Sequence, residues 1–253
     1  MACTAGPAAD SPGTIDLGPG VARSLAQHRA RTIAYLRYEI SLSIPEARDE
    51  PIEGVITACF DLTATGEPLV FDFAAAGAAV LSVTAGGEPT PFETVDEHVI
   101  VPASHLRQGA NEVSIAFVAG DGSLNRADEF LYTLFVPDRA RVAMPIFDQP
   151  DLKARYQLTL ELPVAWEAVT NGGLAERIDG GDRSTWRFAE TEPISTYVFA
   201  FAAGRFEVVV AERAGRQLRM LHRETDEDKV ERNLEAIFDL HGAALEWLDQ
   251  YTG

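Results

Sequence analysis

Residues 35–44 read Tyr-Leu-Arg-Tyr-Glu-Ile-Ser-Leu-Ser-Ile and are followed by Pro45. Along this stretch polar residues alternate with an apolar set, which comprises Leu36, Tyr38, Ile40, Leu42 and Ile44. Because successive side chains of a β-strand point to opposite faces, this period of two predicts a half-buried strand that ends at the proline. The same alternation returns at residues 155–162, which read Arg-Tyr-Gln-Leu-Thr-Leu-Glu-Leu.

Further short strands are expected between turns rich in glycine and proline. They lie at residues 52–62, 69–73, 79–84, 98–101, 112–118, 168–170, 185–189, 196–202, 206–212 and 217–222. The pairs Gly86-Gly87 and Gly180-Gly181 fall between strands, where such pairs indicate hairpin turns. Short strands at this spacing, without helices between them, predict an all-β fold built as an antiparallel β-sandwich rather than a doubly wound sheet.

Two segments have a helical period instead. Residues 21–32 predict a short helix before the first strand, and the segment after Val230 repeats its apolar residues at helical spacing. Thr225 is the expected N-cap of this second helix, with acidic residues in the first turn. Its apolar stripe is broad, so the helix is expected to pack either on the sandwich itself or on a following domain.

The composition excludes some classes of partner. The chain has 39 acidic and 21 basic residues and a formal net charge of −18. Such a charge repels nucleic acid and anionic membrane surfaces, so neither is an expected partner. The sequence contains no apolar stretch of the length of a transmembrane helix. Cys59 lies in an apolar alternating run and is expected to be buried.

Residues 1–19 form a leader of small residues, proline and glycine, which is typical of a flexible linker. Cys3 near its start matches a bacterial lipoprotein after removal of the signal peptide, which predicts a periplasmic or membrane-anchored protein with a lipid on Cys3. A cytoplasmic protein with an irregular start is the alternative.

No catalytic constellation is visible in the sequence. Its five histidines are all more than four residues apart, so the zinc motif His-Glu-x-x-His is absent. The nucleophile motif Gly-x-Ser-x-Gly is absent as well. The chain is therefore expected to contribute no catalytic residue and no metal ligand.

Two ordered segments are far more distinctive. The first reads Phe-Leu-Tyr-Thr-Leu-Phe-Val-Pro at residues 130–137, then Met-Pro-Ile-Phe-Asp-Gln-Pro-Asp-Leu-Lys-Ala at 144–154. The second reads Pro-Ile-Ser-Thr-Tyr-Val-Phe-Ala-Phe-Ala-Ala-Gly-Arg-Phe at residues 193–206. Pro145 and Pro150 of the first segment restrict turns around Phe147. Asp148 is expected to accept backbone N–H bonds in the turn, which is a structural role. In the second segment, Tyr197, Phe199 and Phe201 are expected on one face of a strand that Gly204 ends.

These segments resemble the two signatures of the N-terminal domain of the aminopeptidase N and leukotriene hydrolase family of zinc peptidases. The family patterns are Tyr-Thr-Gln-Phe-Glu-Pro followed by Phe-Pro-Cys-Phe-Asp-Glu-Pro, and Pro-Met-Ser-Thr-Tyr-Leu. Residues 169–172 and 186–188 resemble two shorter family motifs between them. The matching structural residues are Phe147, Asp148, Gln149, Pro150, Ser195, Thr196, Tyr197 and Gly204.

The resemblance implies a saddle-like β-domain at residues 20–222 and a helix at 223–253 that begins the junction to a catalytic domain. It further implies that zinc binds only in that downstream domain of the parent enzyme, which removes N-terminal residues from peptides. The partners of this chain would then be its own catalytic domain and, in the full protein, a peptide substrate. The chain is expected to stop before the zinc ligands and to be inactive alone.

One departure concerns the substrate. The resemblance implies that the Gln and Glu of Thr-Gln-Phe-Glu face the substrate cleft, and the corresponding residues are Leu134 and Val136. An apolar side chain cannot bind the substrate's ammonium group, so other groups must hold it, or the substrate preference differs, or activity is lost. Two alternatives to a peptidase domain are a stand-alone scaffold module and a small sandwich that binds carbohydrate or peptide.

Overall fold

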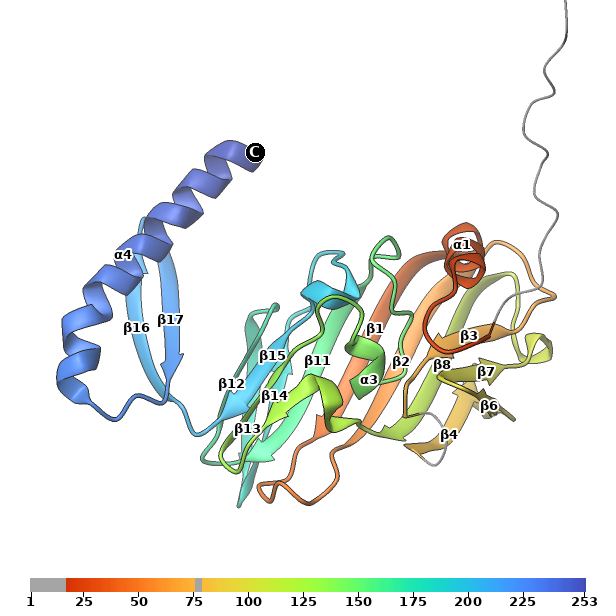
Figure 1. Ribbon diagram of the computed structural model, residues 1–253, viewed down its shortest axis with the longest axis horizontal. Helices are drawn as coiled ribbons and strands as arrows, with labels where there is room; N and C mark the ends of the chain where they lie inside the picture. The colour runs from red at the N-terminus through yellow and green to blue at the C-terminus, as the bar shows by residue number, and fades with distance from the viewer. Residues whose placement is uncertain (1–16, 76–78) are drawn as a thin grey trace, which may run out of the picture. The chain divides into compact units, whose positions relative to one another are not determined.

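The computed structural model describes residues 17–75 and 79–253, which form two compact units (Figure 1). The larger unit comprises residues up to Val164 together with Ala168–Ala203, and the smaller comprises Ala165–Glu167 and Gly204–Gly253. Residues 207–222 therefore fall in the same unit as the C-terminal helix. The domain bounds at residues 20–222 and 223–253 stay a prediction. Among the described residues, no helix is long and apolar enough to cross a membrane. Cys3 lies outside the described residues.

Most of the larger unit is β-structure, as the alternating patterns predicted. Its strands are β1 (Ile33–Ser43), β2 (Glu53–Leu62), β3 (Leu69–Asp72), β4 (Val80–Ala85), β5 (Glu88–Pro89), β6 (Glu93–Val95), β7 (His98–Val101), β8 (Gly109–Val118), β9 (Leu124–Arg126), β10 (Phe130–Thr133), β11 (Arg155–Pro163), β12 (Glu167–Thr170), β13 (Leu174–Gly180), β14 (Arg183–Phe188) and β15 (Phe201–Gly204). The helical elements are α1 (Arg23–Thr32), α3 (Ala140–Ala143), η1 (Ala103–His105), η2 (Asp121–Ser123) and η3 (Thr196–Val198).

The strands form an eight-stranded sheet in the order β13-β14-β11-β1-β2-β8-β4-β5, a four-stranded sheet β12-β15-β10-β9 and a three-stranded sheet β3-β7-β6. Strands β1, β2 and β8 pair antiparallel at the centre of the large sheet. Strand β1 also pairs with β11, in parallel, so that Tyr38 lies opposite Tyr156 and Leu42 opposite Leu160. This parallel pair joins the first half of the chain to the second.

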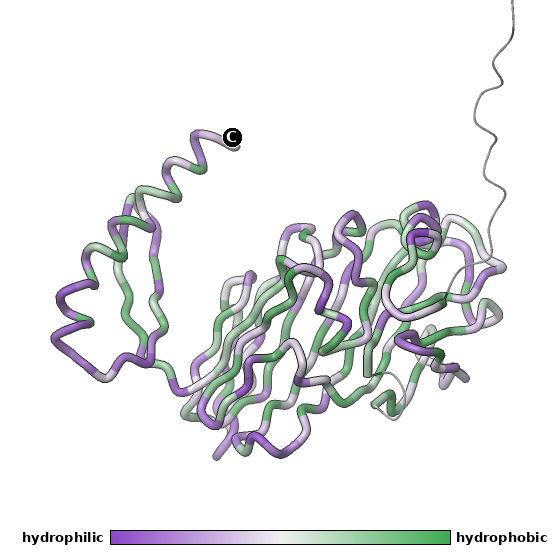
Figure 2. Tube along the Cα trace, viewed as in Figure 1, coloured by the Kyte–Doolittle hydropathy of each residue, from purple (hydrophilic) through white to green (hydrophobic). Residues whose placement is uncertain are grey.

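The large sheet is amphipathic, with apolar and polar residues alternating along its strands (Figure 2). One face is buried and holds Tyr38, Ile40, Leu42, Ile56, Ala58, Phe60, Val113, Ile115, Phe117, Tyr156, Leu158 and Leu160. Cys59 belongs to the opposite face and is only partly buried, so the expectation of a buried cysteine was wrong. The reason is that the run around Cys59 keeps the period of two, and Ala58 and Phe60 occupy the buried face.

The strand expected at residues 196–202 begins later than the sequence indicated. Residues Thr196–Val198 form the 3₁₀ turn η3, because the carbonyl of Ser195 accepts the N–H of Val198 at 3.0 Å. Only Phe201–Gly204 is strand, and it ends at Gly204 as expected. Tyr197 is consequently exposed while Phe199 and Phe201 are buried, so these three aromatic residues do not share a face.

The smaller unit contains the hairpin of β16 (Glu207–Arg213) and β17 (Arg216–His222) together with α4 (Glu227–Thr252). Asp226, rather than Thr225, is the N-cap of α4, because its carboxylate accepts the N–H of Lys229 at 3.1 Å. Phe238 is buried, and Gly242 lies where a Cβ atom would be only 2.8 Å from the Cβ of Arg213. The helix therefore packs on the hairpin through this short section.

Candidate functional site

Arg29 and Asp72 form a buried ion pair beneath the first signature. The two side chains are 2% and 0% exposed, and two guanidinium nitrogens of Arg29 contact the two carboxylate oxygens of Asp72 at 2.7 and 2.6 Å. Arg29 also donates to the carbonyl of Val70 at 2.7 Å and lies 5.1 Å from the ring centroid of Phe147. A bidentate pair with these extra contacts offsets the cost of removing the two charged groups from water.

The signature loop at residues 147–150 attaches to this pair. The backbone N–H of Asp148 donates to Asp72 at 2.8 Å, and the backbone N–H of Phe147 donates to the hydroxyl of Tyr38 at 3.0 Å. The Phe147 ring is fully buried and stacks on the ring of Phe71, with 4.4 Å between the two ring centroids. Gln149 is also buried, and its amide donates to the carbonyl of Ala26 at 3.1 Å.

The carboxylate of Asp148 joins the two signatures. One oxygen accepts the hydroxyl of Thr196 at 2.7 Å, and the other accepts the backbone N–H of Arg141 at 3.1 Å. Burial raises the pKa of Asp148, while these two hydrogen bonds act in the opposite direction. Ser195 adds a second link, because its hydroxyl donates to the carbonyl of Pro150 at 2.6 Å.

The same two signatures also meet at the surface. The Thr133 hydroxyl accepts the backbone N–H of Phe201 at 3.1 Å, and the ring centroids of Phe135 and Phe199 lie 6.3 Å apart. Phe135 is buried, but its neighbours Leu134 and Val136 are 47% and 66% exposed. The exposed apolar residues here are Tyr132, Leu134, Val136, Val169, Tyr197 and Val198. We call them the apolar rim.

A shallow groove of about 320 Å³ crosses strands β10, β15 and β12 beside the apolar rim. Its lining residues are Tyr132, Thr133, Val169, Thr170, Asn171, Ala200, Phe201 and Ala202. Asn171 holds this groove together, since its side chain accepts the N–H of Ala200 at 2.7 Å and donates to the carbonyl of Val198 at 3.2 Å. The groove is lined by neutral residues only, so it presents no charge to a ligand.

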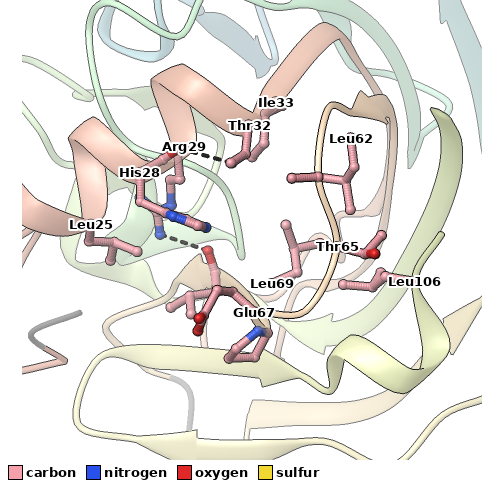
Figure 3. A pocket seen from close by; sticks show the side chains of 13 residues that line it. Leu25, His28, Arg29, Thr32, Ile33, Leu62, Thr65, Glu67, Leu69 and Leu106 are labelled. Carbon is pink, nitrogen blue, oxygen red and sulfur yellow. Dashed lines mark hydrogen bonds between the residues drawn. The ribbon is translucent and has the colours of Figure 1, made fainter. Parts of the chain in front are cut away.

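A second, smaller hollow lies beside α1 (Figure 3). Leu25, Leu62, Leu69 and Leu106 form much of its wall, and the cavity measures about 40 Å³. Burial lowers the pKa of His28 on its edge, although the charge of Glu67 opposes the shift. A cavity of this size accommodates a few water molecules and no peptide.

The described ranges 17–75 and 79–253 bring together no group of three or more His, Cys, Asp or Glu side chains that could hold a metal ion. The residues present therefore do not fit zinc. The described residues provide instead a buried polar cluster and an uncharged, partly apolar groove. The pattern of the sequence did not predict Arg29 and Asp72 as central residues of the cluster, nor His98, whose Nδ1 lies 3.2 Å from a carboxylate oxygen of Asp72. The signal was present, because an acid inside the apolar run at residues 69–73 indicates a buried partner.

Comparison with known proteins shows which family the chain matches. Residues 36–198, well over half of the chain, match the Peptidase M1 N-terminal domain. The chain is 28% identical to aminopeptidase N of Streptomyces lividans over 254 residues, which cover 92% of this chain and 28% of that protein. It is 27% identical over 183 residues to probable aminopeptidase 1 of Sulfurisphaera tokodaii, covering 68% of this chain and 22% of that protein. The chain thus spans less than a third of the length of these relatives.

Solved structures share the fold. The M1 zinc metallopeptidase of Deinococcus radiodurans has a TM-score of 0.62 at 17% identity, covering 75% of this chain and 46% of that chain. A mutant of that peptidase bound to a Tyr-Ser-Ala substrate has a TM-score of 0.60 at 18% identity, covering 75% of this chain and 47% of that one. The family match covers the first signature and residues 193–198 of the second, and the chain belongs to the Peptidase M1 N-terminal domain family.

Proposed function

We propose that this chain is the non-catalytic N-terminal part of a zinc aminopeptidase, in which it docks the catalytic domain and forms one wall of the substrate cleft. The single observation that carries the proposal is the family match over residues 36–198, which includes the first signature and residues 193–198 of the second. Named relatives of this chain are aminopeptidases, and a solved structure of the same fold is bound to a peptide substrate. Zinc would be held by the catalytic domain, because this chain contains no His-Glu-x-x-His motif.

The apolar rim supports the assignment of a cleft wall. Leu134 and Val136 are exposed on either side of buried Phe135, and they occupy the positions that face the cleft by the family resemblance. A wall of this composition favours contacts with apolar side chains or with the peptide backbone, and it cannot bind an ammonium group. The substrate's amino group would therefore be bound by groups of the catalytic domain.

Helix α4 supports the docking role within the smaller unit. Its exposed apolar residues are Ile237, Leu240, Trp247, Leu248 and Tyr251, and the rings of Trp247 and Tyr251 stack at 5.1 Å. Spacings of three and four residues place such a set along one side of a helix. An apolar stripe of this kind is typical of a helix that packs against a further domain.

The experiment is a pair of matched substitutions in the parent enzyme. Val136→Asp places a charge on the proposed cleft wall, whereas Ile178→Asp places the same charge on an exposed residue of β13, at the edge of the eight-stranded sheet. We expect Val136→Asp to lower kcat/KM for aminoacyl-anilides at least tenfold and Ile178→Asp to leave it within twofold. Equal kcat/KM values for the two variants would remove the cleft-wall assignment. A gene product without any downstream zinc motif would instead favour the stand-alone module.

The location of the protein is a separate proposal. We propose that the parent is exported and anchored through a lipid on Cys3, because the small-residue leader around this cysteine matches a processed lipoprotein. Mass spectrometry of the N-terminal peptide from the native source tests it. A diacylglyceryl mass on Cys3 is the expected result, and an unmodified cysteine in a soluble extract contradicts the proposal.

A further inference from the structure

His98 is a buried histidine whose two ring nitrogens both face acceptors. Its Nε2 lies 3.1 Å from the carbonyl oxygen of Gly18, and its Nδ1 lies 3.2 Å from a carboxylate oxygen of Asp72. The second contact has ion-pair distance without the alignment of a hydrogen bond. Neither a carbonyl nor an ionised carboxylate has a proton to donate. Since a neutral imidazole carries only one N–H, both contacts are favourable only when the ring is doubly protonated.

The charges around His98 agree with this state. Burial alone lowers the pKa of His98, but the contact with Asp72, the charge of Asp72 and the carbonyl of Gly18 together raise it above 6.5. Arg29 of α1 acts in the opposite direction and is itself paired with Asp72. Although burial opposes it, the charge of Arg29 and its hydrogen bonds, together with the His98 contact, hold the pKa of Asp72 below its usual range, so the carboxylate stays ionised beside the ring.

The neighbouring residue holds the same segment. The carboxylate of Glu97 accepts the backbone N–H of Gly20 at 2.8 Å and pairs with Arg141. Glu97 and His98 stand at the turn between β6 and β7, and together they contact the two glycines of the segment that leads into α1. The contact of Glu97 with Gly20 needs no proton on His98, whereas the contact of His98 with Gly18 does. Because the two glycines are only two residues apart, we expect loss of the Gly18 contact to loosen the Gly20 contact as well.

We propose that Glu97 and His98 form a proton-dependent latch for the lead-in segment at residues 17–20. The segment is held while His98 is an imidazolium, and the hold weakens when the ring loses a proton. A deprotonated ring must turn a lone pair either toward the Gly18 carbonyl or toward the Asp72 carboxylate, and both arrangements are repulsive. Because the pKa of His98 is raised on folding, the contact of His98 stabilises the folded position of residues 17–20 fully below pH 6.5. This stabilisation is lost as the pH rises through the folded-state pKa.

The test follows the Gly20 amide in the 253-residue chain. Hydrogen exchange of this amide, corrected for the intrinsic effect of pH, is measured from pH 5.5 to 10 alongside an NMR titration of the His98 ring. We expect His98 to titrate above pH 6.5. If the pKa of His98 is one unit higher with the segment held than with it released, the Gly20 protection factor should fall roughly tenfold as the ring loses its proton. The amides of β1 should keep their protection, which distinguishes local release from unfolding.

Three variants complete the experiment. His98→Gln removes the titrating proton, so the pH dependence at Gly20 should disappear, and His105→Gln at an exposed histidine should leave it unchanged. Glu97→Gln keeps His98 and its titration, and should lower Gly20 protection at every pH, which keeps the test valid if the His98 variant folds poorly. The proposal is overturned if His98 does not titrate below pH 10. It is equally overturned if the ring titrates while Gly20 protection stays constant.

Discussion

Asp148 donates its backbone N–H to the carboxylate of Asp72 at 2.8 Å while its own carboxylate accepts the hydroxyl of Thr196 at 2.7 Å. The residue thus connects the buried pair of Arg29 and Asp72 to the second signature, 48 residues further along the chain. Two acidic residues in contact would repel each other, but Arg29 neutralises Asp72 directly. The signature loop is therefore bound to the carboxylate of Asp72, whose negative charge is neutralised by Arg29.

Replacing Asp72 should destabilise the domain strongly. Asp72→Asn leaves Arg29 buried without its counter-charge, and breaking one partner of a buried pair costs about 3–5 kcal/mol in the free energy of unfolding. Urea unfolding followed by tryptophan fluorescence measures this difference. Asp49→Asn is the matched control, because Asp49 is exposed, and its effect should stay within about 0.5 kcal/mol. Equal unfolding midpoints for the two variants would show that the pair contributes nothing.

The effect of Asp72→Asn should depend on pH. Because the pKa of Asp72 is lowered on folding, its contribution is present above the unfolded value of 3.8 and is lost as the pH falls through the folded-state pKa. The stability difference between the parent sequence and Asp72→Asn should be largest near pH 6 and should shrink below pH 3.8. Urea titrations at several pH values test this. A difference that stays constant down to pH 2 contradicts the assignment.

The link between the signatures should be measurable at Thr196. Thr196→Val keeps the shape of the side chain and removes the hydroxyl that donates to Asp148, which should cost roughly 1.5–3 kcal/mol because the acceptor is a buried carboxylate. Thr94→Val on the exposed strand β6 is the control and should be nearly neutral. In the double variant with Asp148→Asn, the two effects should be clearly non-additive. Additive effects would mean that the two side chains do not interact.

Gly120 should tolerate no side chain. A Cβ atom there would lie 2.0 Å from the carbonyl oxygen of Val142, so Gly120→Ala must displace the backbone of α3, which lies between the two parts of the first signature. A loss of about 2 kcal/mol or more is expected from the forced rearrangement. Gly173→Ala is the matched control, since nothing lies within 4 Å of its added atom. Similar thermal midpoints for both variants would contradict the close approach.

The local patterns of the sequence predicted much of this fold. The alternation at residues 35–44 and 155–162 identified β1 and β11, but nothing local could show that they pair in parallel, because that contact joins residues more than a hundred positions apart. The apolar run around Asp72 indicates a buried partner for it, but nothing local shows that this partner is Arg29, which lies 43 positions away. Thr196–Val198 was taken for strand because its apolar run fits one, whereas the turn depends on tertiary bonds at Ser195 and Thr196. Short strands such as β9, with three residues, lack enough length for a visible period.

The proposal that this chain is part of a zinc aminopeptidase is tested most directly by one assay on two proteins. The full gene product and the 253-residue chain are each incubated with alanine p-nitroanilide, with and without a zinc chelator, and release of nitroaniline is followed. The account predicts hydrolysis by the full product that the chelator abolishes and added zinc restores, and no hydrolysis by the chain alone. Hydrolysis that persists in the chelator, or activity in the isolated chain, would contradict it.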